Sequence, residues 1–345
     1  MLGIVLALAD HYLANYGECN IKVNDDKDLN VKGGNTLLAG LLDNKIFLPS
    51  ACGGRATCGF CKCEIKGGGG PLLPTELPFL SKQEIRGNIR MACQIKVKTD
   101  VDIFIPEDLL SAKEYRTQVE AINDLTYDIK ELVLKITDPD TISFKPGQYI
   151  QYQIPNTIEY RAYSVASMPS QDDRIEIITR LVPEGVCTTY MHHVLEIGDE
   201  AVVTGPYGDF YLREESEKEI ICIAGGSGLA PIKCIVYHLF EKGSKRKITF
   251  FFGAREIKDL YYRDEFEKLD RDHENFTFVP AISNPSPEDN WQGETGFVHL
   301  CLEKYIANGE NKEAYLCGPP VMIDAATDIL RDIGINNDDI YFDKF

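Results

Sequence analysis

Hydrophobic and polar residues alternate in two short segments near the start of the chain. Ile21–Val23 and Leu29–Val31 each place an apolar side chain at every second position, and the turn-forming residues 24–26 lie between them. This pattern predicts a β-hairpin. Asn35 or Thr36 can cap a short helix that contains the four leucines that follow.

The same domain continues through a loop rich in glycine and cysteine. Further short strands are predicted near 62–66 and 93–98, around this loop. Two strands, a helix and further strands in this order indicate an α+β fold of the β-grasp type over residues 18–105. Residues 106–114 have the composition of a linker.

The rest of the chain shows two different patterns. Over residues 115–215 the apolar segments are short and separated by turns, which predicts an antiparallel β-barrel. Its predicted strands are Lys130–Ile136, Tyr149–Ile154, Arg174–Arg180 and Ala201–Thr204. Over residues 216–345 strands alternate with helices, which predicts an α/β doubly wound parallel sheet. Its predicted elements are strands Ile220–Ala224, Ile248–Gly253, Phe276–Pro280 and Glu313–Cys317, and a helix over Pro231–Lys242.

The net charge of −18 argues against a nucleic-acid partner, because phosphates bind to basic surfaces. It also argues against adsorption to anionic lipid through a basic patch. Eleven cysteines in a chain of 345 residues do not dominate a small scaffold, so a disulfide framework is not expected. A reducing compartment with metal-binding thiolates fits better, and we expect a cytoplasmic protein.

Residues 1–17 form a separate N-terminal segment with an apolar run over Leu2–Ala9. A bilayer span needs about 20 apolar residues, so this run is too short to cross a membrane alone. It is either a short helix lying on the first domain or the remnant of a membrane anchor. Attachment to the cytoplasmic face of a membrane through the N-terminus therefore stays open.

Four cysteines, Cys52, Cys58, Cys61 and Cys93, have the spacing C-x5-C-x2-C-x31-C, with small residues around the first three. Small residues let a loop fold closely around a cluster and point its N–H groups at the sulfurs. Four thiolates of this kind predict a [2Fe-2S] cluster. Structural zinc is the alternative, but zinc sites usually have two close pairs of ligands. Cys63 is expected to be a packed neighbour and not a ligand.

The cysteine domain resembles the ferredoxin domain of the F subunit of the Na+-translocating NADH:quinone oxidoreductase. The resemblance rests on Leu48–Cys52, Leu73–Leu77 and Met91–Gln94, and on the five residues between the first two cysteines. Related monooxygenase reductases usually have four residues there.

Arg161-Ala162-Tyr163-Ser164 resembles the FAD-binding motif R-x-Y-S of the ferredoxin–NADP+ reductase superfamily. The resemblance implies that Arg161 pairs with the FAD pyrophosphate, that Tyr163 lies against the isoalloxazine and that Ser164 hydrogen-bonds near its hydride-accepting nitrogen. A guanidinium suits a diphosphate and an aromatic ring offers a stacking face. The segment from Gly185 to Thr188 matches the family's second flavin segment, where N–H groups and a hydroxyl hold the pyrophosphate. Residues 205–208 match its closing turn.

The glycines Gly225, Gly226 and Gly228 follow a buried strand and open a helix. Such a turn lets the backbone approach a diphosphate, and the helix N-terminus adds positive potential. The segment matches the GG-x-G-x-AP form of the same superfamily. Cys317-Gly318-Pro319-Pro320 matches its C-G-P-P segment, which implies that Cys317 lies beside the nicotinamide.

The terminal aromatic residue of this superfamily covers the flavin until nicotinamide displaces it, and the resemblance gives this role to Phe345. We therefore expect Ser164, Cys317 and Phe345 to touch the reacting groups, with Gly318, Pro319 and Phe345 among the cofactor-binding residues. NADH is expected instead of NADPH, because Asn284 follows Ser283 where NADPH-dependent relatives often carry an arginine.

These observations predict an NADH-oxidising oxidoreductase, a flavoprotein with an iron–sulfur cluster. Hydride passes from NADH to FAD, and single electrons then pass through [2Fe-2S] to an unidentified protein or quinone acceptor. An electron-input subunit of a membrane NADH:quinone oxidoreductase is the alternative. Only Ile154–Tyr160 stand where that subunit has a long insertion, which puts sodium pumping in doubt. A third hypothesis, a non-enzymatic iron–sulfur sensor, does not need the nucleotide motifs.

Overall fold

A computed structural model describes residues 16–345, and the apolar segment Leu2–Ala9 lies outside them. The chain divides into two compact units. The first contains the described part of Met1–Tyr115, with Ile150–Ala162 and Val202–Tyr207, and the second contains Arg116–Tyr149, Tyr163–Ala201 and Gly208–Phe345. Among residues 16–345, no helix combines the length and apolar character that a bilayer span requires.

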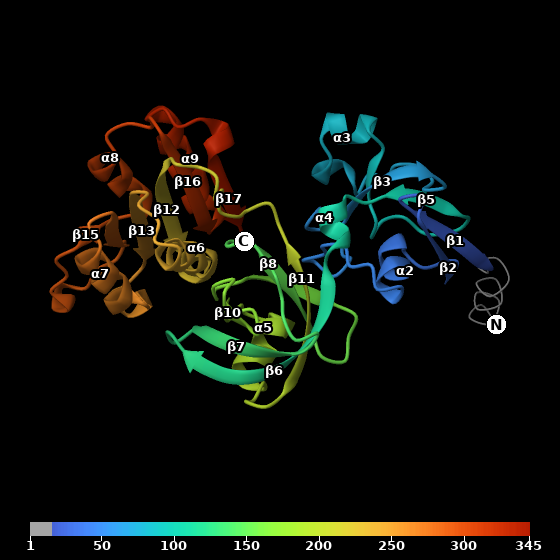
Figure 1. Ribbon diagram of the computed structural model, residues 1–345, viewed down its shortest axis with the longest axis horizontal. Helices are drawn as coiled ribbons and strands as arrows, with labels where there is room; N and C mark the ends of the chain where they lie inside the picture. The colour runs from blue at the N-terminus through green and yellow to red at the C-terminus, as the bar shows by residue number, and fades with distance from the viewer. Residues whose placement is uncertain (1–15) are drawn as a thin grey trace. The chain divides into compact units, whose positions relative to one another are not determined.

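A five-stranded sheet organises the N-terminal part of the first unit, in the order β2-β1-β5-β3-β4 (Figure 1). Its strands are β1 (Glu18–Val23), β2 (Lys27–Lys32), β3 (Lys62–Gly67), β4 (Ile89–Met91) and β5 (Val101–Phe104). β1 pairs with β2 as the predicted hairpin and runs parallel to β5, whereas β3 is antiparallel to β4 and β5. A mixed sheet with a helix against it is the predicted β-grasp arrangement.

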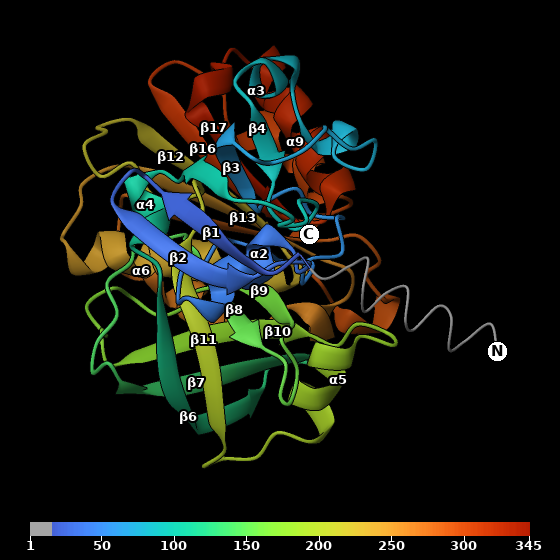
Figure 2. The same ribbon diagram turned by 90° about the vertical axis from the view of Figure 1, so that its right-hand side faces the viewer.

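The helix α2 (Leu37–Asp43) lies against β1 and β2 (Figures 1 and 2). Its cap is Thr36, whose hydroxyl accepts a hydrogen bond from the N–H of Ala39 at 3.2 Å. Leu37 and Leu41 are fully buried in the core of this unit. The short elements η1 (Leu77–Phe79), α3 (Lys82–Arg86) and α4 (Glu107–Leu110) lie outside the sheet.

The strand predicted at 93–98 is wrong. Residues 92–94 form a turn, and the rest of the segment makes one isolated bridge, between Lys96 and Thr36. Ile95 and Val97 are buried, so the alternation that predicted a strand is real. Their backbone groups bond to Leu37 and Asn35 at the start of α2 instead of to a strand. The segment predicted as a linker contains α4 and the first residues of the next strand.

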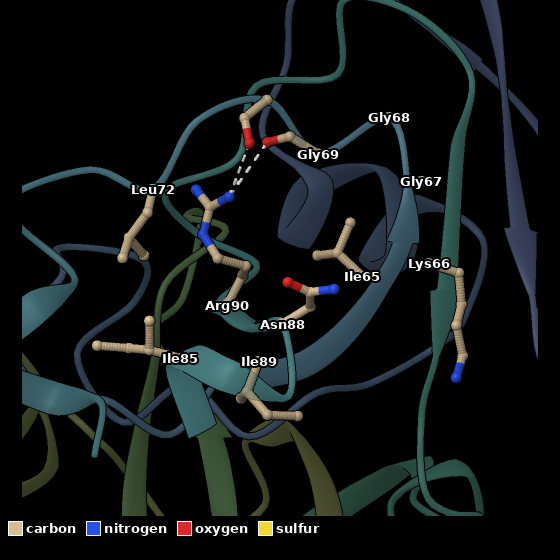
Figure 3. A pocket seen from close by; sticks show the side chains of 11 residues that line it. Ile65, Lys66, Gly67, Gly68, Gly69, Leu72, Ile85, Asn88, Ile89 and Arg90 are labelled. Atoms are coloured by element: carbon tan, nitrogen blue, oxygen red, sulfur yellow. Dashed lines mark hydrogen bonds between the residues drawn. The ribbon is translucent and has the colours of Figure 1, made fainter. Parts of the chain in front are cut away.

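A buried ion pair fixes the segment between β3 and β4. Arg90 and Glu76 lie 2.6 Å apart, and the Glu76 side chain has no exposed surface. The Arg90 guanidinium also donates to the carbonyl oxygens of Gly69 and Gly70 (Figure 3). Arg90 thus holds the glycine segment beside a pocket of about 350 Å³.

The second sheet has the order β10-β7-β6-β11-β8-β9. Its strands are β6 (Lys113–Asp124), β7 (Ile129–Asp138), β8 (Tyr149–Gln153), β9 (Tyr160–Ser164), β10 (Arg174–Arg180) and β11 (Glu200–Tyr207). β7 is antiparallel to β6 and β10. The helix α5 (Val186–His193) follows β10.

The third sheet is parallel, in the order β15-β14-β13-β12-β16-β17 (Figure 1). Its strands are β12 (Glu219–Gly225), β13 (Ile248–Ala254), β14 (Phe276–Ile282), β15 (Glu294–Thr295), β16 (Lys312–Gly318) and β17 (Ile340–Lys344). The turn η2 (Gly226–Gly228) leads from β12 into α6 (Leu229–Glu241). The other helices of this part include α7 (Arg263–Asp272), α8 (Leu302–Tyr305) and α9 (Pro320–Asp332).

Both faces of the third sheet are covered, as a doubly wound fold requires. Phe250 and Phe252 belong to one apolar layer, which includes residues of α6 and α7, and Phe251 belongs to the other, with residues of α8 and α9. Figure 1 labels these four helices around the sheet. The continuous apolar run of β13 is therefore buried on both sides.

Candidate redox sites

The four predicted cysteine ligands come together in the first unit. Cys52 and Cys58 lie in the loop before β3, with their sulfur atoms 3.3 Å apart. Cys61 directly precedes β3, and its thiol hydrogen-bonds to the sulfur of Cys93, which lies just after β4. The antiparallel pairing of β3 with β4 brings these two residues together, and the N–H of Ala92 donates to the carbonyl of Cys61 at 2.7 Å.

Two pairs of thiols suit a cluster of two irons, because each iron takes two protein sulfurs. A single zinc ion needs four ligands around one point. The all-sulfur donor set in two pairs therefore favours [2Fe-2S] over zinc.

The chemistry of the thiols agrees with this interpretation. The hydrogen bond between the two thiols lowers the pKa of Cys93 to about 6 and raises the pKa of Cys61, so the first thiolate of this pair forms at Cys93. Burial raises the pKa of Cys63 to about 12, and Cys63 lies in β3 within the core. Its thiol is therefore neutral and packed.

The loop needs glycine at Gly59 for two reasons. Its φ angle is +73°, and a Cβ there would lie 2.9 Å from the ring of Phe79. A larger residue would strain the backbone and displace the ring, because L-residues rarely adopt this conformation.

The R-x-Y-S motif forms β9, which the sequence did not predict as a strand. Arg161 belongs to the first unit, and Tyr163 and Ser164 belong to the second. The Arg161 guanidinium donates to Glu159 Oε2 and to the carbonyl of Tyr160, both at 2.8 Å. Its side chain is 25% exposed, so part of the guanidinium stays open to an anionic ligand.

Gly185 immediately precedes α5, and Thr188 lies in its first turn. The Thr188 hydroxyl accepts from the N–H of Val182 at 3.1 Å and donates to the carbonyl of Gly185 at 3.3 Å. A Cβ on Gly185 would approach this hydroxyl to 2.6 Å. The hydroxyl thus braces the loop, and backbone N–H groups at the start of α5 are the groups suited to an anion.

The glycine turn between β12 and α6 packs against the end of β16. A Cβ on Gly228 would lie 2.2 Å from the carbonyl oxygen of Cys317, and one on Gly225 would lie 2.8 Å from the sulfur of Met322. These two glycines allow two loops to touch, a role that the motif alone did not indicate. Gly226 differs, because its nearest neighbour is the Arg180 guanidinium at 3.8 Å.

Cys317 is fully buried at the end of β16, and burial raises its thiol pKa well above the usual range. β17 runs parallel beside β16 and pairs Asp343 with Cys317. The chain then ends at Phe345, whose N–H lies 3.4 Å from the carbonyl of Gly318. Phe345 is 58% exposed. Pro319 caps α9, so Cys317, Gly318, Pro319 and Phe345 meet at one edge of the sheet.

Three residues at this edge were not predicted. Burial raises the pKa of Asp343 to about 6. The hydroxyl of Tyr261 donates to the carbonyl of Gly226 at 2.7 Å. Arg180, held by Asp128 at 2.7 Å, places a guanidinium beside the glycine turn. No motif marks these positions, and only the strand order brings them to the site.

Three family descriptions match successive parts of the chain. The 2Fe-2S iron-sulfur cluster binding domain matches residues 21–98, the oxidoreductase FAD-binding domain matches 116–211, and the oxidoreductase NAD-binding domain matches 222–328. The order of the three matches is the predicted order of the domains.

Two curated relatives align over the whole chain, and both are F subunits of Na(+)-translocating NADH-quinone reductases. The one from Neisseria gonorrhoeae is 35% identical over 389 aligned residues, covering 100% of this chain and 96% of the relative. The one from Serratia proteamaculans is 35% identical with the same coverage.

Two solved structures are also similar, each 26% identical and covering 95% of this chain and 98% of theirs. They are a cytochrome P450 reductase from Amycolatopsis, with a TM-score of 0.77, and the ferredoxin reductase in carbazole 1,9a-dioxygenase, with a TM-score of 0.73.

The fold and its domain matches define an NADH-dependent oxidoreductase with FAD and a [2Fe-2S] cluster. Identity over the full length places the chain more narrowly. It belongs to the family of the F subunits of Na(+)-translocating NADH-quinone reductases.

Proposed function

We propose that this chain is an electron-entry subunit. It accepts hydride from NADH at the end of the parallel sheet and delivers single electrons, through the four-cysteine loop, to a membrane-bound quinone-reducing partner. Each NADH that becomes NAD+ releases two electrons and one proton, so two one-electron acceptors are reduced per turnover.

The bound groups supply the redox chemistry: FAD takes a hydride as an electron pair, and the iron–sulfur cluster carries one electron at a time. The chain supplies binding, orientation and charge. Arg161 would pair with the flavin pyrophosphate, Tyr163 would stack on the flavin ring, and Ser164 would hydrogen-bond near its reactive nitrogen. The iron would be held by Cys52, Cys58, Cys61 and Cys93.

The NADH site is formed by the glycine turn and by the end of β16. Gly226 and the start of α6 would hold the diphosphate, because N–H groups and the helix dipole favour an anion there. Arg180 adds a positive charge beside them. Gly225 and Gly228 keep the turn packed on the Cys317–Gly318 backbone, and Pro319 begins the next helix.

One observation supports the assignment of the nicotinamide site to the end of the parallel sheet that contains Cys317. The parallel pairing of β17 with β16 brings the terminal Phe345 next to Gly318, at the edge that contains Cys317. An exposed ring at this position is suited to leave when nicotinamide arrives. Phe345 would thus cover the flavin face in the absence of nucleotide and leave this face open to nicotinamide when NADH binds.

The identity over the full length to the F subunits supports a membrane partner and a location at the cytoplasmic face of a membrane. A second candidate partner is an oxygenase, supported by the similarity to the two oxygenase-system reductases. The alignment of 389 positions to 345 residues implies roughly 44 positions without a counterpart here, so the membrane complex that this chain serves need not pump sodium.

Membranes from cells that lack this chain test the choice between a membrane-bound quinone-reducing partner and an oxygenase. Adding the purified protein should restore NADH-dependent reduction of a short-chain quinone by these membranes, and the Cys93→Ser variant should not. If quinone reduction by the membranes is the same with and without the chain, the membrane partner is refuted.

A further inference from the structure

The cysteine loop is attached to the β8–β9 hairpin within the first unit. The N–H of Ser50 donates to Oε1 of Gln151 at 2.8 Å, and both residues are buried. The Gln151 side chain also hydrogen-bonds to the hydroxyl of buried Tyr207. A buried amide with partners on both sides fixes the start of the loop on β8.

A second attachment lies three residues beyond Cys52. Arg55 Nη2 donates to both carboxylate oxygens of Glu159, at 2.8 and 2.9 Å. The same carboxylate accepts from Arg161 Nη2 at 2.8 Å. Glu159 therefore joins a guanidinium of the cysteine loop to the guanidinium of the flavin motif.

The short hairpin fixes the position of Glu159. The N–H of Ile154 donates to the carbonyl of Glu159 at 2.8 Å, and the N–H of Thr157 donates to the carbonyl of Ile154 at 3.1 Å. Asn156 has a φ angle of +60°, which suits a tight turn. The six residues between β8 and β9 thus leave Glu159 little freedom.

We propose that Glu159 is a positioning residue that holds the iron–sulfur loop, through Arg55, on the flavin-binding strand in the arrangement that single electrons cross. Electron transfer slows steeply as the distance between donor and acceptor grows, so the fraction of molecules with the loop attached sets the observed rate. One exposed ion pair contributes little. Here one guanidinium nitrogen contacts both oxygens of a carboxylate that is shared with Arg161, and a buried amide acts together with this contact. The inference rests on the assignment of the four cysteines as cluster ligands.

Arg55→Met and Glu159→Gln in the full-length holoprotein test the proposal. Rapid mixing with NADH separates flavin reduction from cluster reduction, and ferricyanide reports electrons taken directly from the flavin. Both variants should reduce the cluster about fivefold more slowly, because the attached fraction falls. The flavin phase, the ferricyanide rate and the EPR spectrum of the reduced cluster should match those of the unchanged protein. Arg55→Lys should recover most of the rate.

Glu64→Gln is the matched control. Glu64 is paired with Lys66 at 2.7 Å and is 32% exposed, against 29% for Glu159, but it lies in β3 away from the hairpin. This variant should leave every rate unchanged. Arg55→Met separates attachment from flavin binding, since it removes the hydrogen bonds of Arg55 to Glu159 and keeps both Glu159 and Arg161.

Unchanged cluster reduction in both variants would overturn the proposal. So would a slow cluster phase confined to Glu159→Gln with flavin released from that variant, since Glu159 would then act on flavin binding through Arg161. Absence of the cluster EPR signal from the unchanged protein is a distinct outcome, and it removes the ligand assignment on which the inference rests.

Discussion

Asp343 lies opposite Cys317 where β17 runs parallel beside β16. The thiol is fully buried, and burial raises the pKa of the carboxyl from its ordinary value of 3.8 to about 6. A carboxylate here would stabilise the positive charge that nicotinamide acquires as hydride leaves.

The rate of flavin reduction by NADH should therefore rise between pH 5 and pH 7, with an apparent pKa near 6, as Asp343 ionises. Asp343→Asn should abolish this rise and leave a lower, flat profile. Stopped-flow measurements across this range check the prediction. An unchanged profile in the variant would assign the ionisation to another group.

Ionisation of the Asp343 carboxyl also makes the stability of the folded protein depend on pH. Because the folded pKa lies above the unfolded value, the native state binds more protons between about pH 4 and pH 6, and the stability contributed by Asp343 falls as pH rises through this window. Thermal unfolding at pH 4.5 and pH 7 should show a smaller loss of stability with rising pH for Asp343→Asn than for the unchanged protein.

Cys61→Ser should remove the cluster and leave the flavin. NADH-dependent ferricyanide reduction should persist, whereas cytochrome c reduction and the reduced-state EPR signal should be lost. Cys63→Ala is the control, because Cys63 is buried in β3 and is not among the four ligands. Loss of the EPR signal in Cys63→Ala alone would show that the ligand set is wrong.

Gly228→Ala should weaken NADH binding and destabilise the nucleotide domain by about 2–3 kcal/mol, because the new methyl group would collide with the backbone of Cys317. Gly87→Ala is the control, since a Cβ there would meet nothing closer than 3.5 Å and its φ is −84°. KM for NADH and denaturant unfolding give the two readouts. Equal behaviour of the two variants would refute the packing role.

Arg90→Met should destabilise the first unit by about 3–5 kcal/mol, because the enclosed carboxylate of Glu76 would lose its partner. Combining it with Glu76→Leu should recover much of the loss. Denaturant unfolding of the holoprotein measures both effects. If the double variant is as unstable as Arg90→Met alone, the loss of stability comes from packing and not from the ion pair.

The sequence predicted the elements whose signals are local. The hairpin 21–31 and the Thr36 cap follow from alternation and capping chemistry, and the glycine turn at 225–228 follows from its place after a buried run. Residues 93–98 misled the prediction, because burial of Ile95 and Val97 gives the same alternation whether the backbone bonds to a strand or to a helix start. The sequence did not predict β17. This strand is short, and polar residues interrupt its apolar ones, so no regular alternation can be recognised.

The residues of the candidate sites also divide into those with a local sequence signal and those without one. Motifs indicated the cysteines, Arg161 and Cys317, because their residue types recur at fixed spacing. Asp343 and Glu159 are two among 54 acidic residues, and nothing near them in the sequence separates them from solvated surface charges. Their significance arises from strand pairing and from a hairpin turn, which are long-range features.

We expect electrons from nicotinamide to reach both flavin and iron within this one polypeptide. Anaerobic titration of the purified protein with NADH, followed by flavin absorbance and [2Fe-2S] EPR, measures this electron path. Flavin bleaching and a reduced-cluster signal should both be complete at about 1.5 NADH per chain, since FAD takes two electrons and the cluster takes one. Bleaching of the flavin with no cluster signal, or a protein that binds neither group, would rule out an electron path from nicotinamide through flavin to iron in this chain.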